Sequence, residues 1–212
     1  MYKYHPKTKE ELIKVIKKEI YEVQGTKKNP NWKADLNCID TSLITDMSYL
    51  FAEEYNLEKF DGDISKWDVS NVENMESMFY NSKFNGDISN WYVFNVKNMN
   101  FMFYKSRFNR NISNWNVSNI REMIRMFAYS DFNQDISNWK LDKIKTLKDI
   151  FFHSRFNQDI GSWPEYLKKQ TGLKNISVSE KYLKLPDKIK SLNTLKNILI
   201  YIEKNIENIE KN

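Results

Sequence analysis

Residues 84–107 read FNGDISNWYVFNVKNMNFMFYKSR, and the stretches 60–83, 108–131 and 132–155 follow the same pattern. Each copy has Phe at its first position and Trp at its eighth, and a fifth copy runs from Phe156 to Trp163. Self-similarity at a fixed period of 24 residues is the signature of a stacked array. In such an array no unit buries its apolar face without a neighbour. The repeats therefore predict a binding scaffold rather than an enzyme.

Within one copy, the sequence predicts a short strand, a bend and a short helix. Residues 63–65 are typical of a very short strand, and Ile64 and Trp67 differ in parity, so the chain must bend between them. Four apolar residues then recur at helical spacing: Val72, Met75, Met78 and Phe79. We therefore expect an α/β repeat solenoid with short strands on one side and short helices on the other, and with a helical N-terminal cap.

Both ends of the chain differ from the repeats. Thr8 and Glu11 have the spacing of a capping box before an apolar pattern, which predicts an amphipathic helix over residues 8–24. The division we predict is 1–34 for a capping helix and loop, 35–163 for five to six rungs, and 164–212 for a C-terminal region. In the last region, residues 187–211 fit one long helix or further leucine-rich rungs with a closing helix, and we favour the rungs.

Residues 35–51 form a degenerate repeat that precedes the first repeat at 60–83. Its apolar residues align with those of the later copies, but Phe51 precedes Phe79 by 28 residues instead of 24. The stretch AEEYNLE (52–58) therefore carries a four-residue insertion.

The phrase FNxDISNWxVSNVxxMxxMF resembles the BspA-like repeat family, a relative of leucine-rich repeats that includes repeat lipoproteins of mycoplasmas. The similarity covers about residues 35–163 and keeps the Phe, Trp and Met positions. It implies a bacterial protein with a leucine-rich-repeat-like solenoid of short parallel strands, and the better-described members are surface or secreted proteins that bind other molecules. We expect this chain to lack a leader, a lipidation Cys and a wall anchor, so the resemblance does not carry over the location or an adhesin role.

Charge and cysteine content restrict the class of protein to which the chain can belong. Residues 1–33 carry nine Lys or Arg and four acids, and residues 164–212 carry ten and six, whereas residues 34–163 carry fourteen and eighteen. A nucleic-acid binder would place its basic excess on the working face rather than at the ends. The single Cys38 excludes an internal disulfide and fits a reducing compartment. We expect a cytoplasmic protein without membrane insertion, secreted or surface-bound only if a leader was removed.

The repeated polar and aromatic columns favour structural roles. We expect the Trp column to be buried with each ring against the Trp of the next rung, and the Met pairs to fill the core. An Asn column headed by Asn85 and an Asp column headed by Asp63 can satisfy backbone groups at bends. His153 stands in a solvent-facing column, and Cys38 is alone. We therefore expect no catalytic residues, no metal and no cofactor.

The columns that vary between copies are the candidate partner-binding residues. They combine polar and aromatic side chains, and Tyr, Phe and Arg are types that anchor interfaces. The set, here called the variable face, consists of Lys66, Asp68, Asn90, Tyr92, Phe94, Arg110, Asn114, Asn116, Gln134, Asn138 and Lys140. Simple drift at these positions is the alternative explanation.

We predict a non-catalytic protein that binds a protein partner through the strand side of the solenoid, as an inhibitor or adaptor. The alternatives are nucleic-acid association through the Lys-rich ends and an adhesin fragment. A monomer is expected, with a dimer through the C-terminal region as the alternative.

Overall fold

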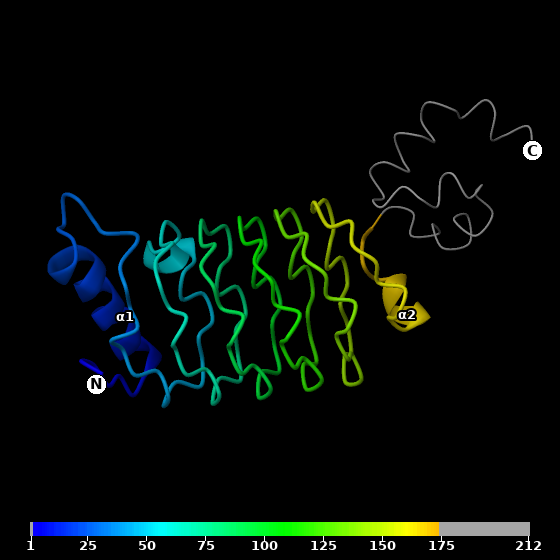
Figure 1. Cartoon of the computed structure of the whole chain (residues 1–212), viewed down its shortest axis with the longest axis horizontal. Coiled ribbons are helices and arrows are strands. Elements are labelled where there is room, and N and C mark those ends of the chain that lie inside the picture. Colours follow the sequence, from blue (N-terminus) through cyan, green and yellow to red (C-terminus); the bar gives the residue numbers. More distant parts are fainter. Residues whose placement is uncertain (1, 174–212) are drawn as a thin grey trace, which may run out of the picture.

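The computed structural model describes residues 2–173 and shows a stack of similar rungs (Figure 1), a rung being the coil made by one copy of the repeat. Helix α1 (Lys9–Lys18) lies at one end of the stack and α2 (Glu165–Lys168) at the other. Two further helical turns are η1 (Glu19–Val23), of the π type, and η2 (Glu53–Tyr55), of the 3-10 type. None of these helices has the length and apolar character needed to cross a bilayer.

The predicted α/β class is wrong. Residues 60–155, which hold the four full copies, contain neither a helix nor a strand. Neighbouring rungs are joined by single parallel bridges, such as Asn74 with Asn98 and Asn98 with Glu122. The chain is therefore a stack of turns and extended segments, and the leucine-rich-repeat architecture of strands facing helices is not present in residues 2–173.

Backbone conformation explains why the predicted helix does not form. Ser77 and Asn81 have φ values of 55° and 53°, in the left-handed region, which interrupts a right-handed helix within each copy. The Phe79 N–H donates to the Met102 carbonyl of the next rung at 2.9 Å instead of to a carbonyl four residues back. Every second N–H from residue 75 to residue 81 bonds to the next rung in this way. The spacing that predicts a helix is thus produced by consecutive turns.

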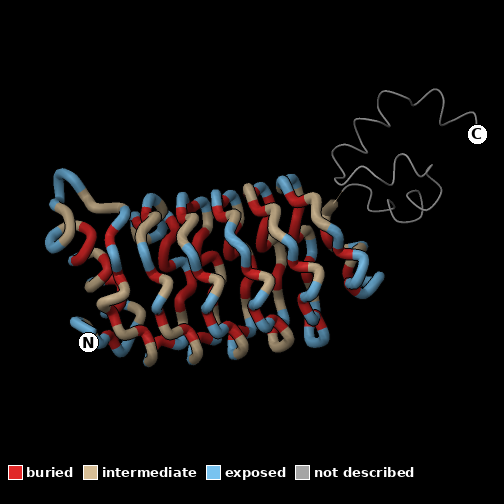
Figure 2. Tube along the Cα trace, viewed as in Figure 1, coloured by how far each residue is buried: buried red, intermediate tan, exposed pale blue. Residues whose placement is uncertain are grey.

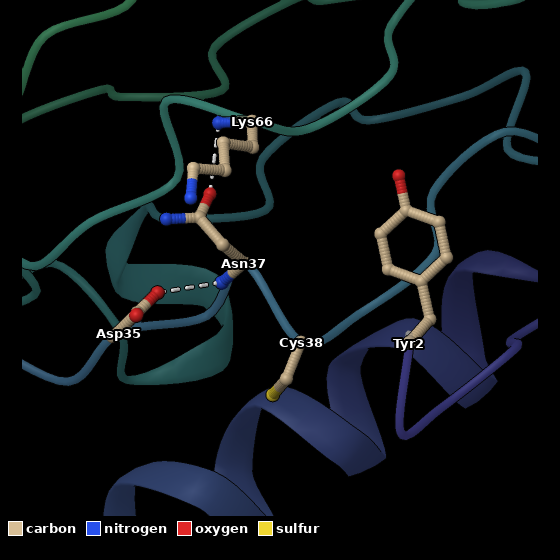
Figure 3. A pocket seen from close by; sticks show the side chains of 5 residues that line it. All are labelled: Tyr2, Asp35, Asn37, Cys38 and Lys66. Atoms are coloured by element: carbon tan, nitrogen blue, oxygen red, sulfur yellow. Dashed lines mark hydrogen bonds between the residues drawn. The ribbon is translucent and has the colours of Figure 1, made fainter.

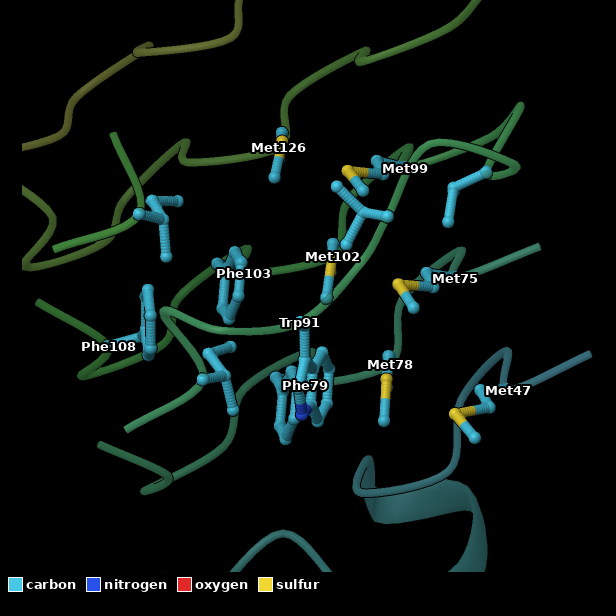
Figure 4. Close-up of a cluster of buried hydrophobic side chains, with 14 of the residues drawn as sticks. Met47, Met75, Met78, Phe79, Trp91, Met99, Met102, Phe103, Phe108 and Met126 are labelled. Atoms are coloured by element: carbon cyan, nitrogen blue, oxygen red, sulfur yellow. The ribbon is translucent and has the colours of Figure 1, made fainter. Parts of the chain in front are cut away.

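A continuous column of buried residues forms the core and runs through all rungs (Figure 2). Phe79 stacks on Phe84 with ring centroids 4.4 Å apart and on Phe103 of the next rung at 5.4 Å. Methionines such as Met75 and Met78 are completely buried beside these rings (Figure 4), which confirms that they fill the core. Each rung presents apolar atoms to both neighbours, so burial depends on stacking.

The Trp column is buried as expected, but its contacts are different. Trp115 is only 3% exposed, and its indole Nε1 donates to the Ile88 carbonyl of the preceding rung at 3.0 Å. Its ring packs against Phe103 with centroids 6.5 Å apart, and no contact with another Trp was found in residues 2–173. The predicted Trp–Trp packing is therefore wrong, and each indole instead ties two rungs together through a hydrogen bond.

The Asn and Asp columns satisfy backbone groups at the bends. The side-chain oxygen of Asn85 accepts from the Asn109 N–H of the next rung at 2.9 Å, and Asn109 repeats this with Asn133 at 2.8 Å. Asp87 accepts from the Ser89 N–H at 2.9 Å within its own rung. That hydrogen bond is the main reason why the pKa of Asp87 is lowered. The interpretation of the Asn column as a structural ladder is confirmed.

The N-terminal helix is confirmed with different bounds, because α1 and η1 together run from Lys9 to Val23. Thr8 accepts from the Glu11 N–H at 3.3 Å, while the Glu11 carboxylate accepts from the Lys7 N–H at 2.7 Å. Buried apolar side chains cover the first rung from this segment: Leu12, Ile13, Ile16 and Ile20.

The four-residue insertion is visible in the hydrogen-bond register. The Met47 N–H donates to the Asn74 carbonyl, 27 residues on, whereas the Met75 N–H donates to the Asn98 carbonyl, 23 residues on. The difference of four residues is accommodated around η2. The three-part division of the chain stays a prediction, and the alternatives for residues 187–211 lie outside the described residues.

Candidate functional site

The variable face lies on the surface of the stack. Eight of its residues are exposed: Lys66, Asn90, Tyr92, Arg110, Asn114, Asn116, Asn138 and Lys140. Three are half-buried: Asp68, Phe94 and Gln134. Because inward and outward side chains alternate, Val93 points into the core at 1% exposure while Tyr92 and Phe94 on either side of it point outward.

Several residues of the variable face are engaged in hydrogen bonds within the scaffold. The Arg110 Nε donates to the Asn85 carbonyl at 2.8 Å, and the Asn138 side chain donates to the Ser113 carbonyl at 3.1 Å. The Gln134 side chain likewise donates to a side-chain oxygen of the preceding rung at 3.0 Å. These side chains therefore stabilise the stack in addition to any contact with a partner.

Asp68 and Asn116 occupy the same column and both hold local turns. The Asp68 carboxylate accepts from the Ser70 N–H at 2.9 Å, and the Asn116 side chain accepts from the Ser118 N–H at 3.2 Å. Tyr92, in the same column of the rung between them, can make no such bond with its ring. The aromatic residue in this column therefore replaces a turn-holding polar one.

Tyr92 and Phe94 form an aromatic pair on this surface. Their ring centroids are 6.0 Å apart with the rings tilted by 39°, and Tyr92 is 57% exposed. The backbone under the pair is fixed, because the Asn119 side chain donates to the Phe94 carbonyl at 3.0 Å. A preformed apolar pair on a rigid backbone is typical of an interface anchor.

Two open hollows lie near the N-terminal end. The first, of about 370 Å³, is lined by five residues (Figure 3): Tyr2, Asp35, Asn37, Cys38 and Lys66. In it the Asn37 side-chain oxygen accepts from the Lys66 N–H at 2.8 Å, so this amide positions the next rung. Burial raises the pKa of the Cys38 thiol, which opposes formation of the nucleophilic thiolate.

The second hollow, of about 620 Å³, lies along residues 23–33, in the loop after η1. Neither hollow brings together a nucleophile and a base. Among residues 2–173, no three His, Cys, Asp or Glu side chains gather as a set that could hold a metal ion.

A second aromatic surface was missed from the sequence. We call it the aromatic stripe, and it consists of Tyr80, Phe101, Tyr104, Tyr129, Phe152 and His153. Apart from Phe101, its residues come from the segments 80–83, 104–107, 128–131 and 152–155, for which the sequence predicted no binding role. The signal is an aromatic residue in that segment of every copy, but its position moves by one residue between Tyr104 and Tyr129. His153 is exposed, as predicted.

The two aromatic surfaces lie on opposite sides of the core. Phe79 and Trp91 meet inside the stack with ring centroids 6.4 Å apart. The next residue after each of them points outward, and these residues are Tyr80 of the stripe and Tyr92 of the variable face.

Comparison with known proteins identifies the family. Residues 20–128 and 104–179 match the family described as "Mycoplasma protein of unknown function, DUF285". No curated protein and no solved structure matched the chain. The matched residues extend from the N-terminal helix through all copies of the repeat and cover well over half of the sequence. The chain therefore belongs to the DUF285 family of mycoplasma proteins.

Proposed function

We propose that the protein is a non-catalytic binding scaffold whose variable face recognises a protein partner. The observation that carries the proposal is the Tyr92–Phe94 pair, in which Tyr92 is 57% exposed. The corresponding columns hold polar residues in the neighbouring copies, Asn116 and Ser118 for example. An aromatic pair exposed on one rung alone gives the repeating frame a single distinctive contact point.

Energetic arguments support a protein partner. Exposed Tyr and Phe side chains supply a large apolar contact area and lose little rotamer entropy on binding. The rungs are held by a continuous network of backbone hydrogen bonds, so little backbone change is needed when a partner docks. The resemblance to BspA-like repeats, whose better-described members bind other molecules, is consistent with this role. An inhibitor or adaptor would act by covering a surface of its partner.

A matched set of variants tests the proposal. Tyr92→Asn with Phe94→Ser copies the residues of the third repeat, so the fold should keep its thermal midpoint. Lys145→Glu copies Glu73 in the first repeat and serves as the control, because it lies outside the variable face. Proteins that co-purify with the immobilised wild-type chain from a lysate of its own organism would be identified by quantitative mass spectrometry.

Direct binding of the purified partner would then be measured by titration calorimetry. We expect the Tyr92/Phe94 double variant to bind at least about tenfold more weakly, which corresponds to about 1.4 kcal/mol. The Lys145→Glu control should bind like the wild type. Equal affinities for the wild type and the double variant would refute the variable face as the binding site.

A further inference from the structure

The rings of the aromatic stripe form one continuous contact chain across four rungs. Tyr80 stacks on Tyr104 with centroids 4.9 Å apart, and Tyr104 meets Tyr129 edge to face at 5.5 Å. Tyr129 then contacts Phe152 at 5.6 Å and His153 at 5.2 Å. Tyr129 is 44% exposed, so part of this chain of rings is open to solvent.

Backbone conformation shows that the scaffold does not need aromatic residues in the stripe. Phe101 and Tyr129 have φ values of 57°, in a region that bulky residues avoid. The first repeat has Ser77 and Asn81 at these positions in the same left-handed conformation, and Asn tolerates it far better. The conformation therefore belongs to the scaffold, and the aromatic side chains are not required to form the turns.

The stripe is also positively charged. Four basic residues and one acid occur in the segments 80–83, 104–107, 128–131 and 152–155. Arg155 is paired with Asp131 at 3.1 Å, whereas Lys83, Lys105 and Arg107 form no ion pair with a described carboxylate. The Lys105 ammonium lies 5.5 Å from the Tyr104 ring centre and 6.0 Å from that of Tyr129. Positive charge beside exposed rings favours an acidic partner.

We propose that the aromatic stripe, with Lys83, Lys105 and Arg107, is a second docking surface that binds an acidic protein segment carrying aromatic or large apolar side chains. The carboxylates of the segment face the cations, while its apolar side chains pack on the rings around Tyr129. Because this surface lies across the core from Tyr92, its occupation is independent of the variable face.

The geometry favours a protein segment over a single-stranded nucleic acid. Base stacking needs ring faces that are free to receive a base. Here one face of Tyr80 is taken by Tyr104 and one face of Tyr129 by His153, which leaves fewer ring faces for bases.

Two double variants, each of which replaces one Lys and one Tyr by Asn, test the docking surface. Lys105→Asn with Tyr129→Asn copies Asn81 of the first repeat and removes one Lys and one Tyr from the stripe. Lys140→Asn with Tyr92→Asn copies Asn116 of the third repeat and removes the same two residue types from the variable face. Both doubles therefore lose the same charge and the same ring, but on opposite sides of the core.

The probe is a short fluorescein-labelled peptide that alternates Glu with Phe or Trp, followed by fluorescence anisotropy with the full chain. Comparison probes are the same peptide with Lys in place of Glu, and oligo-deoxythymidine. We expect the acidic peptide to bind the wild type, with an affinity that falls as salt is added. The stripe double should weaken binding at least about tenfold, and the variable-face double should not change it.

Several results would overturn the proposal. Absence of binding by the acidic peptide would remove the docking surface, and an equal loss in both doubles would show that only net charge matters. Tighter binding of oligo-deoxythymidine, with loss in the stripe double, would assign the surface to nucleic acid instead. None of these outcomes affects the proposed function at Tyr92 and Phe94, because that test depends on a different pair of residues.

Discussion

Replacement of Trp115 by Ala would measure how strongly one rung is tied to the next. The side chain is 3% exposed and belongs to the third of the four full copies. Burial of about 200 Å² of aromatic surface at about 25 cal/mol per Å² contributes at most about 5 kcal/mol, and Ala retains a small part of it. The hydrogen bond from Nε1 to the Ile88 carbonyl adds about 1 kcal/mol. We expect a loss of about 3–5 kcal/mol in the free energy of unfolding.

Trp115→Phe separates the two contributions, because it keeps a ring next to Phe103 and removes only the donor and part of the volume. The Ile88 carbonyl would still accept from the Trp91 N–H at 3.1 Å, so no buried acceptor would be left without a partner. We expect a loss of about 1–2 kcal/mol for this variant. Urea unfolding followed by circular dichroism gives both values, with the exposed Asn114→Ala as a control expected within about 0.5 kcal/mol of the wild type.

A cost below about 1 kcal/mol for Trp115→Ala would refute the role of the indole as a tie between rungs. An equal cost for Ala and Phe would refute the partition between ring burial and hydrogen bond. Because each rung contacts only its neighbours, a change in the middle of the stack weakens the interfaces on both sides of it.

Two further predictions concern backbone conformation and pH. Asn81 is exposed and has a φ of 53°, in the left-handed region that Val avoids and Gly tolerates. Asn81→Val should therefore destabilise the fold by about 1–2 kcal/mol, while Asn81→Gly should not. Equal thermal midpoints for the two variants would contradict this. The N–H groups of Ser89 and Ser137 lower the pKa of Asp87 and Asp135 in the folded state. The stabilising effect of these hydrogen bonds is present at pH values above the pKa of the unfolded state, and it is lost as the pH falls through the pKa of the folded state. The midpoint temperature of thermal unfolding should therefore decrease as the pH is lowered below about 4. The double variant Asp87→Asn with Asp135→Asn copies Asn111, whose side chain accepts the same bond at 2.9 Å. It should reduce the dependence of the thermal midpoint on pH in the acid range, and an unchanged dependence would show that other groups cause it.

The period, the buried positions and the structural columns could be predicted because repetition reports their environment several times. A Trp or Asn that recurs in each copy meets the same neighbours in each rung, so the burial of Trp115 and the bonding of Asn109 followed from the sequence. Repetition could not show the backbone conformation. The left-handed positions hold Ser77, Phe101 and Arg125 in successive copies, and none of these residues signals a positive φ. A helix was therefore predicted where the chain makes turns.

The two surfaces differ in how visible they are from the sequence. Tyr92 and Phe94 stand out because the same columns hold polar residues in other copies, so comparison of the copies identifies them. The aromatic stripe is hidden by the same comparison, because an aromatic residue occurs in every copy and shifts by one position at Tyr129. Only the ring contacts show that Tyr104 and Tyr129 belong to one surface, at a centroid distance of 5.5 Å.

Residues 170–172, which follow α2, occupy the edge of the last described rung. The Phe151 N–H, which in earlier copies would bond to the next rung, donates to the Thr171 carbonyl at 2.9 Å after the chain has passed through α2. Gln170 contributes its side-chain oxygen to the Leu147 N–H at 3.3 Å in the same row. Gly172 follows with a φ of 71° and lies against Asp149, where a side chain would meet backbone at 3.0 Å. An exposed row of donors invites pairing with another chain, and this short segment closes part of that row.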